Sequence, residues 1–297
     1  MAGDVEKNQG RVVKTYNSYY YVDTGGERVA CRLRGRFKQE RFSLVVGDEV
    51  IFAKTGSGEG IIEKILPRHS LLKRPAVANV DQALLVFAAA NPDLNPALLD
   101  QFLVLAEQSR LDIIICINKA DLAVPTALAE LAAKYRGIGY QILFTSTKDG
   151  RGLAELKASL QNKISVFSGP SGVGKSSLLN LIEPGFNLQT GQVSQKIGRG
   201  KHTTRFAELF RLAGGAFVVD TPGFSFTEFD DFTATELAYY FPEFEPFLPG
   251  CKFNTCLHLS EPGCQVKQAV ADRLILAERY ASYVDILQKI KEKRRVY

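Results

Sequence analysis

The stretch ISVFSGPSGVGKSSLLNLI, residues 164–182, contains the pattern that decides the fold. It predicts a short apolar strand over 164–167, a glycine-rich loop over 169–174 and a helix over 175–182. The loop matches the phosphate-binding P-loop in the strand–loop–helix setting that such a loop requires. Its glycines let successive backbone N–H groups turn toward phosphate oxygens, which a Cβ atom would hinder. We therefore expect a nucleoside triphosphate to bind here.

Two side chains of this stretch have expected roles of their own. Lys175 is placed to reach the β- and γ-phosphates, and the hydroxyl of Ser176 is placed to bind Mg²⁺. The expected phosphate-binding residues are Gly169, Pro170, Ser171, Gly172, Val173, Gly174, Lys175, Ser176 and Ser177.

The chain on both sides of the P-loop alternates apolar runs of strand length with helical segments. Fully apolar strands with intervening helices are typical of a parallel sheet that is buried on both faces. We therefore predict a central α/β domain over residues 71–228. Its expected strands are 83–88, 113–117, 142–144, 164–167 and a hairpin of 206–212 with 216–220; its expected helices are 96–109, around 126–135, 152–161 and 175–182.

The motif Asn118-Lys-Ala-Asp121, directly after the strand predicted over 113–117, indicates which base is bound. A carboxylate can accept two hydrogen bonds, from N1–H and the 2-amino group of guanine, whereas adenine would leave Asp121 unpaired. Such a site can reject the wrong base by roughly 10⁴-fold or more. A plain helix start capped by Asp is the alternative, and the nearby P-loop argues against it. The expected guanine-binding residues are Asn118, Lys119, Ala120 and Asp121, with Ser146 and Thr147 of a later loop offering a backbone amide to the guanine oxygen.

Two later segments complete an expected magnesium and γ-phosphate site. In Asp220-Thr-Pro-Gly223, Asp220 can hold Mg²⁺ through water and Gly223 can bring its amide to the γ-phosphate, although a simple strand turn is the alternative. The Gly- and Gln-rich segment 185–205 is predicted to be a mobile switch, in which Thr203 or Thr204 closes on Mg²⁺.

Phe224 stands after Gly223, where many GTPases have a Gln that orients the attacking water. Because Phe cannot hydrogen-bond water, we expect slow intrinsic hydrolysis. His202 is the proposed replacement once a partner orders the switch, and contact with RNA or solvent is the alternative role. The expected catalytic residues are Lys175, His202, Thr203, Thr204 and Gly223.

The order of these motifs is circularly permuted, because the base-recognition motif at 118–121 precedes the P-loop at 169–176 and the segment at 220–223. A GTPase usually begins with the P-loop and ends with the base-recognition motif. In the permuted order the segment at 220–223, which acts as a second switch, leads directly into the C-terminal region, so loss of the γ-phosphate could move that region.

Three cysteines and a histidine gather near the C-terminus. Cys251, Cys256, His258 and Cys264 offer a full tetrahedral set for a structural Zn²⁺, and unrelated buried cysteines are the alternative. We predict a zinc-binding domain over 229–297. It ends in a long helical pattern with apolar residues at three- and four-residue intervals from 266 to 290, supported by an Asp285–Lys289 pair.

Residues 1–70 are predicted to form a small β-barrel, because short strands recur between glycine-containing turns. Periodicity alone leaves an OB-fold and an SH3-like barrel open. The expected strands include 11–14, 19–22, 28–33 and 49–53, with breaks at 25–26, 47–48 and 56–60.

Composition sets broader limits. With 37 Lys and Arg against 32 Asp and Glu, the net charge of +5 is too small to name a partner. Basic residues concentrate in 28–41, 196–205 and 289–295, however, which favours a polyanion partner. No apolar run is long enough to span a membrane, and the polar N-terminus argues against secretion. An odd count of five cysteines favours a reducing compartment.

Taken together, the motifs resemble a known family. The permuted order, the barrel in front and the pattern Cys251-Lys-Phe-x-x-Cys256-x-His258-x-x-Glu261-Pro-x-Cys264 are similar to the ribosome small-subunit-dependent GTPases called RsgA or YjeQ. The resemblance covers essentially the whole chain. It implies an OB-fold at the N-terminus and a cytoplasmic bacterial GTPase that acts late in 30S assembly. It also implies contacts with 16S rRNA and hydrolysis that the 30S subunit stimulates.

The expected ligands are therefore GTP and GDP with Mg²⁺, and one structural Zn²⁺. We expect a monomer that has no membrane partner. A GTP-dependent RNA-binding module with incidental hydrolysis is the alternative function. A P-loop ATPase or kinase is a second alternative, which the motif Asn118-Lys-Ala-Asp121 opposes.

Overall fold

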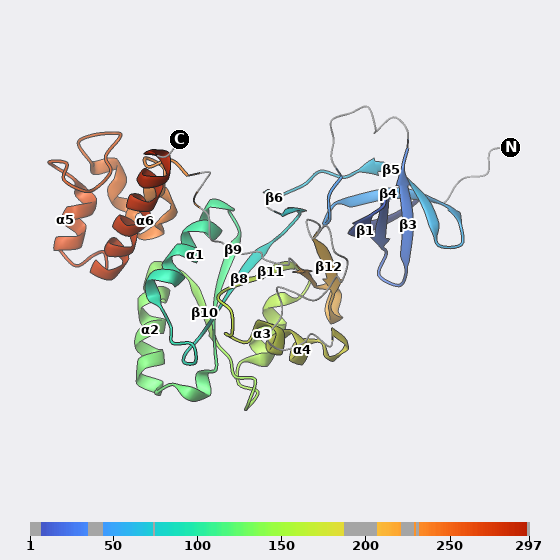
Figure 1. Cartoon of the computed structure of the whole chain (residues 1–297), viewed down its shortest axis with the longest axis horizontal. Coiled ribbons are helices and arrows are strands. Elements are labelled where there is room, and N and C mark those ends of the chain that lie inside the picture. The colour runs from blue at the N-terminus through green and yellow to red at the C-terminus, as the bar shows by residue number, and fades with distance from the viewer. Residues whose placement is uncertain are drawn as a thin grey trace. The chain divides into compact units, whose positions relative to one another are not determined.

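The computed structural model of the chain (Figure 1) describes residues 7–34, 44–73, 75–186, 207–220, 229 and 232–295. The chain divides into two compact units. The first comprises Met1–Gln82, Leu153–Phe167 and Lys175–Phe224, and the second comprises Ala83–Gly152, Ser168–Gly174 and Ser225–Tyr297. The domain boundaries expected after residues 70 and 228 stay a prediction.

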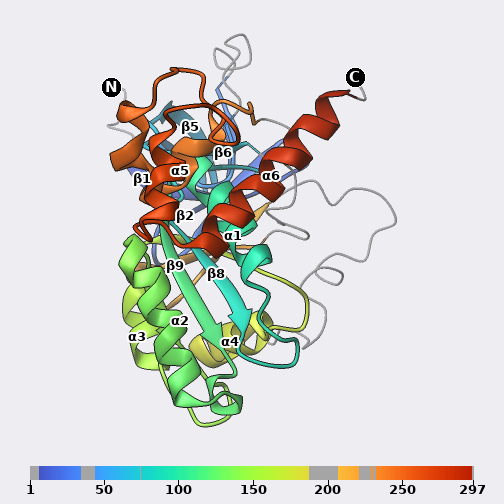
Figure 2. The same ribbon diagram turned by 90° about the vertical axis from the view of Figure 1, so that its left-hand side faces the viewer.

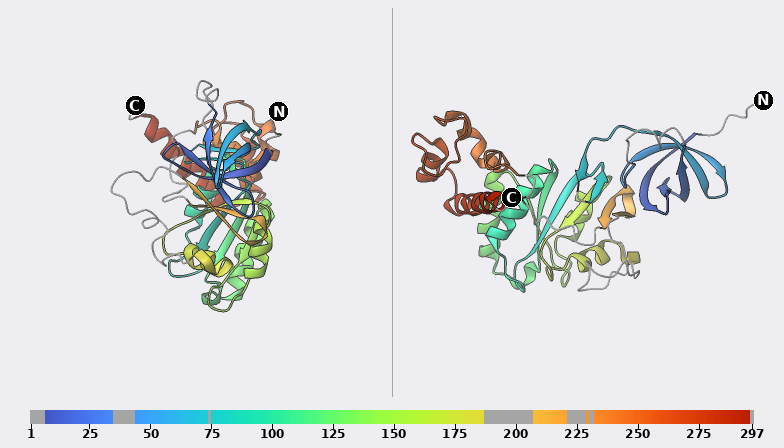
Figure 3. Two further views of the ribbon diagram at one scale, coloured as in Figure 1. Left: turned by 90° about the vertical axis from the view of Figure 1, so that its right-hand side faces the viewer. Right: turned by 45° about the horizontal axis from the view of Figure 1, so that its top comes forward.

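Five strands of the first unit close into the N-terminal barrel (Figure 3), in the order β1-β2-β3-β5-β4. The strand β3 pairs in parallel with β5, and the other neighbouring strands of the barrel pair in antiparallel fashion. Five strands in a closed barrel are typical of an OB-fold, so the predicted barrel is confirmed. The strands are β1 (Lys7–Tyr16), β2 (Tyr19–Asp23), β3 (Arg28–Leu33), β4 (Glu49–Gly56) and β5 (Glu59–Ile65).

The break expected at 56–60 is wrong in part, because β5 begins at Glu59 and includes Gly60. A Cβ atom at Gly60 would lie 2.9 Å from Cδ2 of Phe52 and 3.0 Å from Sγ of Cys31. Glycine therefore stands in this strand because the barrel interior leaves no space for a side chain, and not because the chain turns there.

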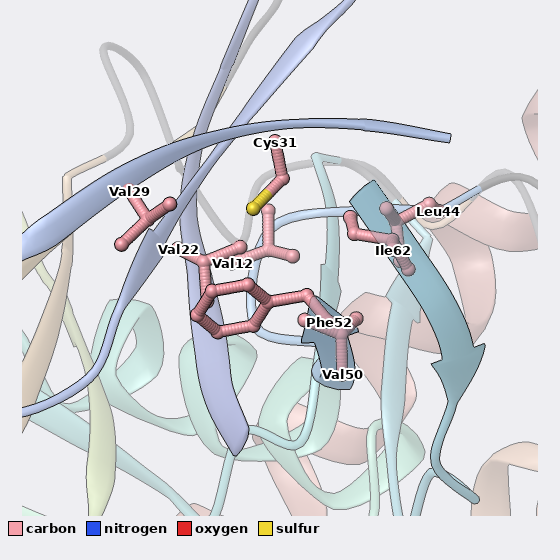
Figure 4. Close-up of a cluster of buried hydrophobic side chains, with 8 residues drawn as sticks. All are labelled: Val12, Val22, Val29, Cys31, Leu44, Val50, Phe52 and Ile62. Carbon is pink, nitrogen blue, oxygen red and sulfur yellow. The ribbon is translucent and has the colours of Figure 1, made fainter. Parts of the chain in front are cut away.

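Apolar side chains fill the barrel (Figure 4). Apart from Leu44, which precedes β4, they lie on the inward-facing side of the strands, as expected for a sheet with one face turned inward. The core residues are Val12, Val22, Val29, Cys31, Leu44, Val50, Phe52 and Ile62.

The first unit also contains the elements that flank the P-loop in the sequence. The strand β11 (Ile164–Ser168) leads into the loop, and the helix α4 (Lys175–Ile182) follows it as predicted. The strand β13 (Phe217–Asp220) is parallel to β11, and β12 (Glu208–Arg211) pairs with β13 in the expected antiparallel hairpin. The remaining elements are α3 (Leu153–Leu160), the 3-10 turns Pro184–Phe186 and Ala213–Gly215, and a short hairpin of β6 (Leu71–Lys73) and β7 (Ala76–Ala78), which the sequence did not predict.

Ion pairs connect the barrel to the hairpin of β12 and β13. Lys14 of the barrel bonds to Glu208 of β12 at 2.8 Å, and Arg211 of β12 pairs with Asp23. The ring of Phe217, at the start of β13, has the guanidinium carbons of Arg11 and Arg211 at 5.2 and 5.4 Å. Contacts at both strands therefore hold the hairpin against the barrel.

In the second unit, three strands are neighbours in the order β10-β9-β8; Figure 2 shows β8 and β9 side by side. The pair β10–β9 is parallel, and every residue of β8 is buried, as expected for a sheet covered on both faces. The helix α1 (Pro96–Gln108) starts where predicted, because Asn95 accepts the N–H of Leu98 and Pro96 has no N–H to satisfy. The other elements are β8 (Gln82–Ala88), β9 (Asp112–Asn118), β10 (Gln141–Phe144), α2 (Pro125–Ile138) and the turn η2 (Ala120–Leu122).

The C-terminal part of this unit contains the 3-10 segments η5 (Leu237–Tyr240) and η6 (Pro242–Gly250) before two helices. The single long helical pattern expected over 266–290 is wrong. It is divided into α5 (Gln265–Ala271) and α6 (Ala277–Arg295).

The division between α5 and α6 has a local cause. Asp272 caps α5 and Arg273 adopts a left-handed φ of 61°, which ends the helix. Leu274, assigned to the apolar stripe, is consequently 66% exposed, and Ile275 is buried instead. The expected pair Asp285–Lys289 is present at 2.7 Å. Among the described residues, no helix is both long enough and apolar enough to cross a bilayer.

Adjacent isoleucines of β5 give a matched test of the barrel core, since Ile62 is fully buried and Ile61 is 37% exposed. We expect Ile62→Ala to lower the free energy of unfolding by about 2–5 kcal/mol, because the cavity adds to the lost burial. Ile61→Ala should cost less than about 1 kcal/mol. Urea unfolding followed by circular dichroism measures both. Equal losses at the two positions would contradict this assignment of the inner face.

Candidate nucleotide-binding site and metal centre

The P-loop adopts backbone conformations that require glycine. Gly169, Gly172 and Gly174 have φ values of 144°, 79° and 98°. A Cβ atom at Gly169 would lie 1.9 Å from the carbonyl oxygen of Val86 in β8, and one at Gly174 would lie 2.3 Å from Nδ2 of Asn118. The loop therefore packs directly against the end of β9 and the backbone of β8, which only glycine permits.

Asn118 joins the P-loop to a second loop. Its fully buried side chain donates from Nδ2 to the carbonyl of Val173 at 2.8 Å. Its Oδ1 accepts from the hydroxyl of Thr145 at 3.2 Å. This role was missing from the sequence prediction, which placed Asn118 among the guanine-binding residues only.

Lys119 makes a second connection, from a left-handed φ of 56°. Its ammonium group donates to the carbonyl of Gly172 at 2.8 Å and to the carbonyl of Asn91. Lys119 thereby ties the loop over 89–95, between β8 and α1, to the P-loop.

Asp121 and Ser146 lie together, as the sequence predicted for two loops of one site. The hydroxyl of Ser146 donates to Oδ1 of Asp121 at 2.8 Å. Its oxygen accepts the N–H groups of Lys148 and Asp149 at 3.2 and 3.3 Å, which fixes the turn. The amide of Ala120 bonds to the carbonyl of Thr145 at 3.0 Å. The carboxylate of Asp121 is therefore held in one orientation before any ligand arrives.

Lys175 and Ser176 begin the helix α4. Burial lowers the pKa of Lys175 to about 8, because a low-dielectric setting disfavours its charged form. An anion bound beside it would favour the ammonium form again. Ser176 is 5% exposed. These two residues thus have the burial and charge that a phosphate and metal site needs.

Several predicted residues lie outside the part of the chain that the structure describes. These are His202, Thr203, Thr204, Gly223 and Phe224. Asp220 is described as the last residue of β13, without its side chain. The structure consequently adds nothing to their predicted roles.

The four predicted metal ligands come together in the second unit. One ligand atom from each of Cys251, Cys256, His258 and Cys264 lies within 4.8 Å of the others. Nδ1 of His258 is 3.6 Å from Sγ of Cys251 and 3.3 Å from Sγ of Cys264. A tetrahedral zinc ion would separate sulfur and nitrogen ligands by about 3.6 Å. The donor set and its spacing therefore fit one structural metal ion.

Burial raises the pKa of the Cys256 thiol to about 12. Without a cation the thiol would stay protonated at neutral pH, whereas a bound metal ion stabilises the thiolate.

Neighbouring residues fix the metal-binding loop. The carboxylate of Glu261 accepts the N–H groups of Leu257 and Leu259, each at 2.8 Å. From α6, the hydroxyl of Tyr283 donates to the carbonyl of Leu257 at 2.9 Å, and that of Tyr280 to the carbonyl of His258 at 2.6 Å. The sequence showed Glu261 only as part of a family pattern, and no local signal pointed to the tyrosines.

A family model described as RsgA GTPase matches residues 65–230, and one described as RsgA N-terminal domain matches residues 9–62. The chain belongs to the RsgA GTPase family. It is accordingly a GTP hydrolase, which excludes the ATPase or kinase alternative.

Individual RsgA proteins match along their whole length. The small ribosomal subunit biogenesis GTPase RsgA of Caldanaerobacter subterraneus is 45% identical over 98% of both chains. The crystal structure of YjeQ from Thermotoga maritima aligns with a TM-score of 0.84 and 40% identity, covering 96% of this chain and 99% of that one. YloQ, described as a circularly permuted GTPase, aligns with a TM-score of 0.82 and 40% identity, covering 99% and 98%. The predicted fold, with its permuted GTPase domain, is thus confirmed.

Gly169→Ala tests the close approach of the P-loop to β8. We expect a loss of at least about 2 kcal/mol, since the new methyl group must displace backbone and the φ of 144° strains any other residue. Gly137→Ala is the matched control, because Gly137 lies in α2 with nothing within 4 Å of its Cβ position. Alanine there should stabilise by about 0.5–1 kcal/mol. Thermal unfolding of both variants measures the difference, and a stable Gly169→Ala protein would contradict the described packing.

Proposed function

We propose that the chain binds the 30S ribosomal subunit and hydrolyses GTP to GDP and phosphate during late maturation of that subunit. The observation that carries the proposal is the match over 98% of both chains to an RsgA protein of Caldanaerobacter subterraneus. That relative is named a small ribosomal subunit biogenesis GTPase. Assembly of this subunit in bacteria takes place in the cytoplasm, so we place the protein there, as a monomer.

The barrel supports 16S rRNA as the direct partner. The guanidinium of Arg32 lies 4.5 Å above the ring of Tyr19, and Tyr16 beside it in the β1–β2 hairpin is 60% exposed. Exposed aromatic rings with arginine can stack on unpaired bases, and OB-folds bind oligonucleotides at this face. Lys289 and Lys291 near the end of α6 add positive charge to the C-terminal region.

The geometry of the two loops supports the proposed nucleotide site. Asp121, oriented by Ser146, would accept two hydrogen bonds from guanine, while backbone amides at 146–147 would contact the guanine oxygen. The P-loop amides and Lys175 would hold the β- and γ-phosphates. A magnesium ion bound there would offset charge on the phosphate oxygens. Its proposed ligands are Ser176, Asp220 and either Thr203 or Thr204.

Completion of the site by a partner accounts for Phe224, which offers no hydrogen bond to water. We assign the water-orienting role to His202, and a γ-phosphate contact to the amide of Gly223. The same Phe224 favours a second candidate function, a GTP-dependent RNA-binding module in which the bound state acts and hydrolysis only resets it.

GTP turnover with and without purified 30S subunits tests the proposal, with 50S subunits and ATP as controls. We expect 30S subunits to stimulate GTP hydrolysis strongly, 50S subunits to have no such effect, and ATP not to be hydrolysed. His202→Ala should lower the stimulated rate by about 10²-fold and leave sedimentation with 30S unchanged. Unstimulated hydrolysis together with tight GTP binding would instead support the RNA-binding module. Full activity of His202→Ala would reject its assigned role.

Asp121→Asn tests base recognition. Two hydrogen bonds to a charged carboxylate correspond to about 3–6 kcal/mol, so GTP affinity should fall by about 10²-fold or more. Xanthosine triphosphate should gain affinity, because its 2-carbonyl can accept from the new amide. Calorimetry with both nucleotides measures the exchange. Asp149→Asn, in the exposed loop nearby, should bind GTP normally. Unchanged GTP affinity in Asp121→Asn would reject the assignment.

The metal centre is proposed to hold one structural zinc ion, since thiolates and imidazole favour this metal. Elemental analysis of the purified protein should give about one zinc per chain. Cys256→Ser should lose the metal and lower the melting temperature, whereas Cys31→Ala in the barrel should retain it. A zinc-free protein of normal stability would contradict the site.

A further inference from the structure

A buried polar cluster joins α1 to the C-terminal region. At its centre, the guanidinium of Arg279 in α6 donates to Oδ1 of Asp100 in α1 at 2.7 Å. It also donates to both carboxylate oxygens of Glu243 in η6, at 2.6 and 3.2 Å. Ser282 and Tyr135 add hydrogen bonds to Asp100, at 2.6 and 3.0 Å. The elements α1, α2, α6 and η6 therefore meet at one guanidinium and two carboxylates.

The central residues of this cluster are buried. The side chains of Arg279 and Asp100 are each 3% exposed, and the guanidinium lies 4.7 Å above the ring of Phe241. Burial opposes the charge of Arg279, but the hydrogen bonds to Glu243 and the charges of Asp100 and Glu243 outweigh it and raise the pKa. Apolar residues of the same size often stabilise as well as a buried ion pair. The pair instead has a geometric consequence, because it permits only one placement of α6 on α1.

The start of α1 leads to the nucleotide loops. The loop over 89–95 precedes the helix, and its Ala89 amide bonds to the carbonyl of Asn118 at 2.8 Å. The carbonyl of Asn91 accepts from Lys119. Pro92 lies over the P-loop, with Cδ 3.8 Å from the Cβ position of Gly172. A displacement of α1 would therefore move the loop over 89–95, which contacts Lys119 and the P-loop.

We propose that Asp100 and Arg279 are positioning residues of the nucleotide site, through which the C-terminal region sets the affinity for guanine nucleotide. They fix α1, and with it the loop over 89–95, against Lys119 and the P-loop. This inference rests on the proposed assignment of Asp121 and the P-loop as the guanine nucleotide site. It gives α6 a role at a site whose ligand it does not touch.

Titration of the full-length, metal-loaded protein with a fluorescent GDP analogue tests this proposal. Asp100→Asn and Arg279→Gln should each raise the Kd about fivefold, within the usual range of coupling between sites. The double variant should have a Kd no higher than that of the single variant with the higher Kd, because each change alone already removes the same Asp100–Arg279 interaction. The single-turnover rate of bound GTP should stay within about twofold of wild type, so that the change falls on binding.

Two further variants separate positioning from stability. Asp285→Asn removes the exposed carboxylate that pairs with Lys289 on the same helix, and it should leave the Kd unchanged. Tyr135→Phe removes a single hydrogen bond to Asp100 and should fold even where the charge variants do not. It should raise the Kd about twofold. A purely structural role predicts lower melting temperatures with a wild-type Kd below the transition, and that result overturns the proposal.

Asp121→Asn, titrated alongside, distinguishes this inference from the proposed function. If Asp121→Asn weakens GDP binding and the Asp100, Arg279 and Tyr135 variants do not, this inference alone fails. If Asp121→Asn binds GDP like the wild type, the proposed nucleotide site fails and the inference fails with it.

Discussion

The side-chain amide of Asn118 holds together the two loops on which the nucleotide site depends. It is fully buried, so each of its polar atoms needs a partner, and it finds them in the carbonyl of Val173 and the hydroxyl of Thr145. The bond to Val173 brings the P-loop so close that Gly174 has no space for a Cβ atom. The position of the Asn118 amide therefore requires glycine at residue 174, and glycine there lets the amide reach the P-loop. An alanine at residue 174 would either displace the amide or open the loop.

Local patterns in the sequence predicted most of the fold. The helix α4 occupies residues 175–182 as expected, because the glycine-rich loop ends just before Lys175 and an apolar helical pattern begins there. The barrel strand at 28–33 was also placed correctly. The misplaced break at Gly60 depends on distant residues instead. Gly60 was read as a turn because its real constraint, the nearness of Phe52 and Cys31, is visible only in the folded barrel.

The candidate site divides in the same way. The residue types and their spacing predicted that the metal ligands would gather. Asp121 and Ser146 were assigned to one base-binding site, and the structure brings their side chains into contact. Motif spacing did not predict that Lys119 would bond to Gly172 and Asn91. Backbone carbonyls have no signature in a sequence. Any lysine can reach one, and only the fold determines which.

The Asp100–Arg279 pair extends this argument to the C-terminal region. The two residues are 179 positions apart, and no local pattern relates them. A shift of α6 by one turn would move Arg279 about 5.4 Å along the helix, away from Asp100 and Glu243. Such a shift would leave a buried guanidinium and two carboxylates unpaired, at a cost of about 3–5 kcal/mol or more. The polar cluster therefore sets the register of α6, and Tyr280 and Tyr283 meet the metal-binding loop in that register alone.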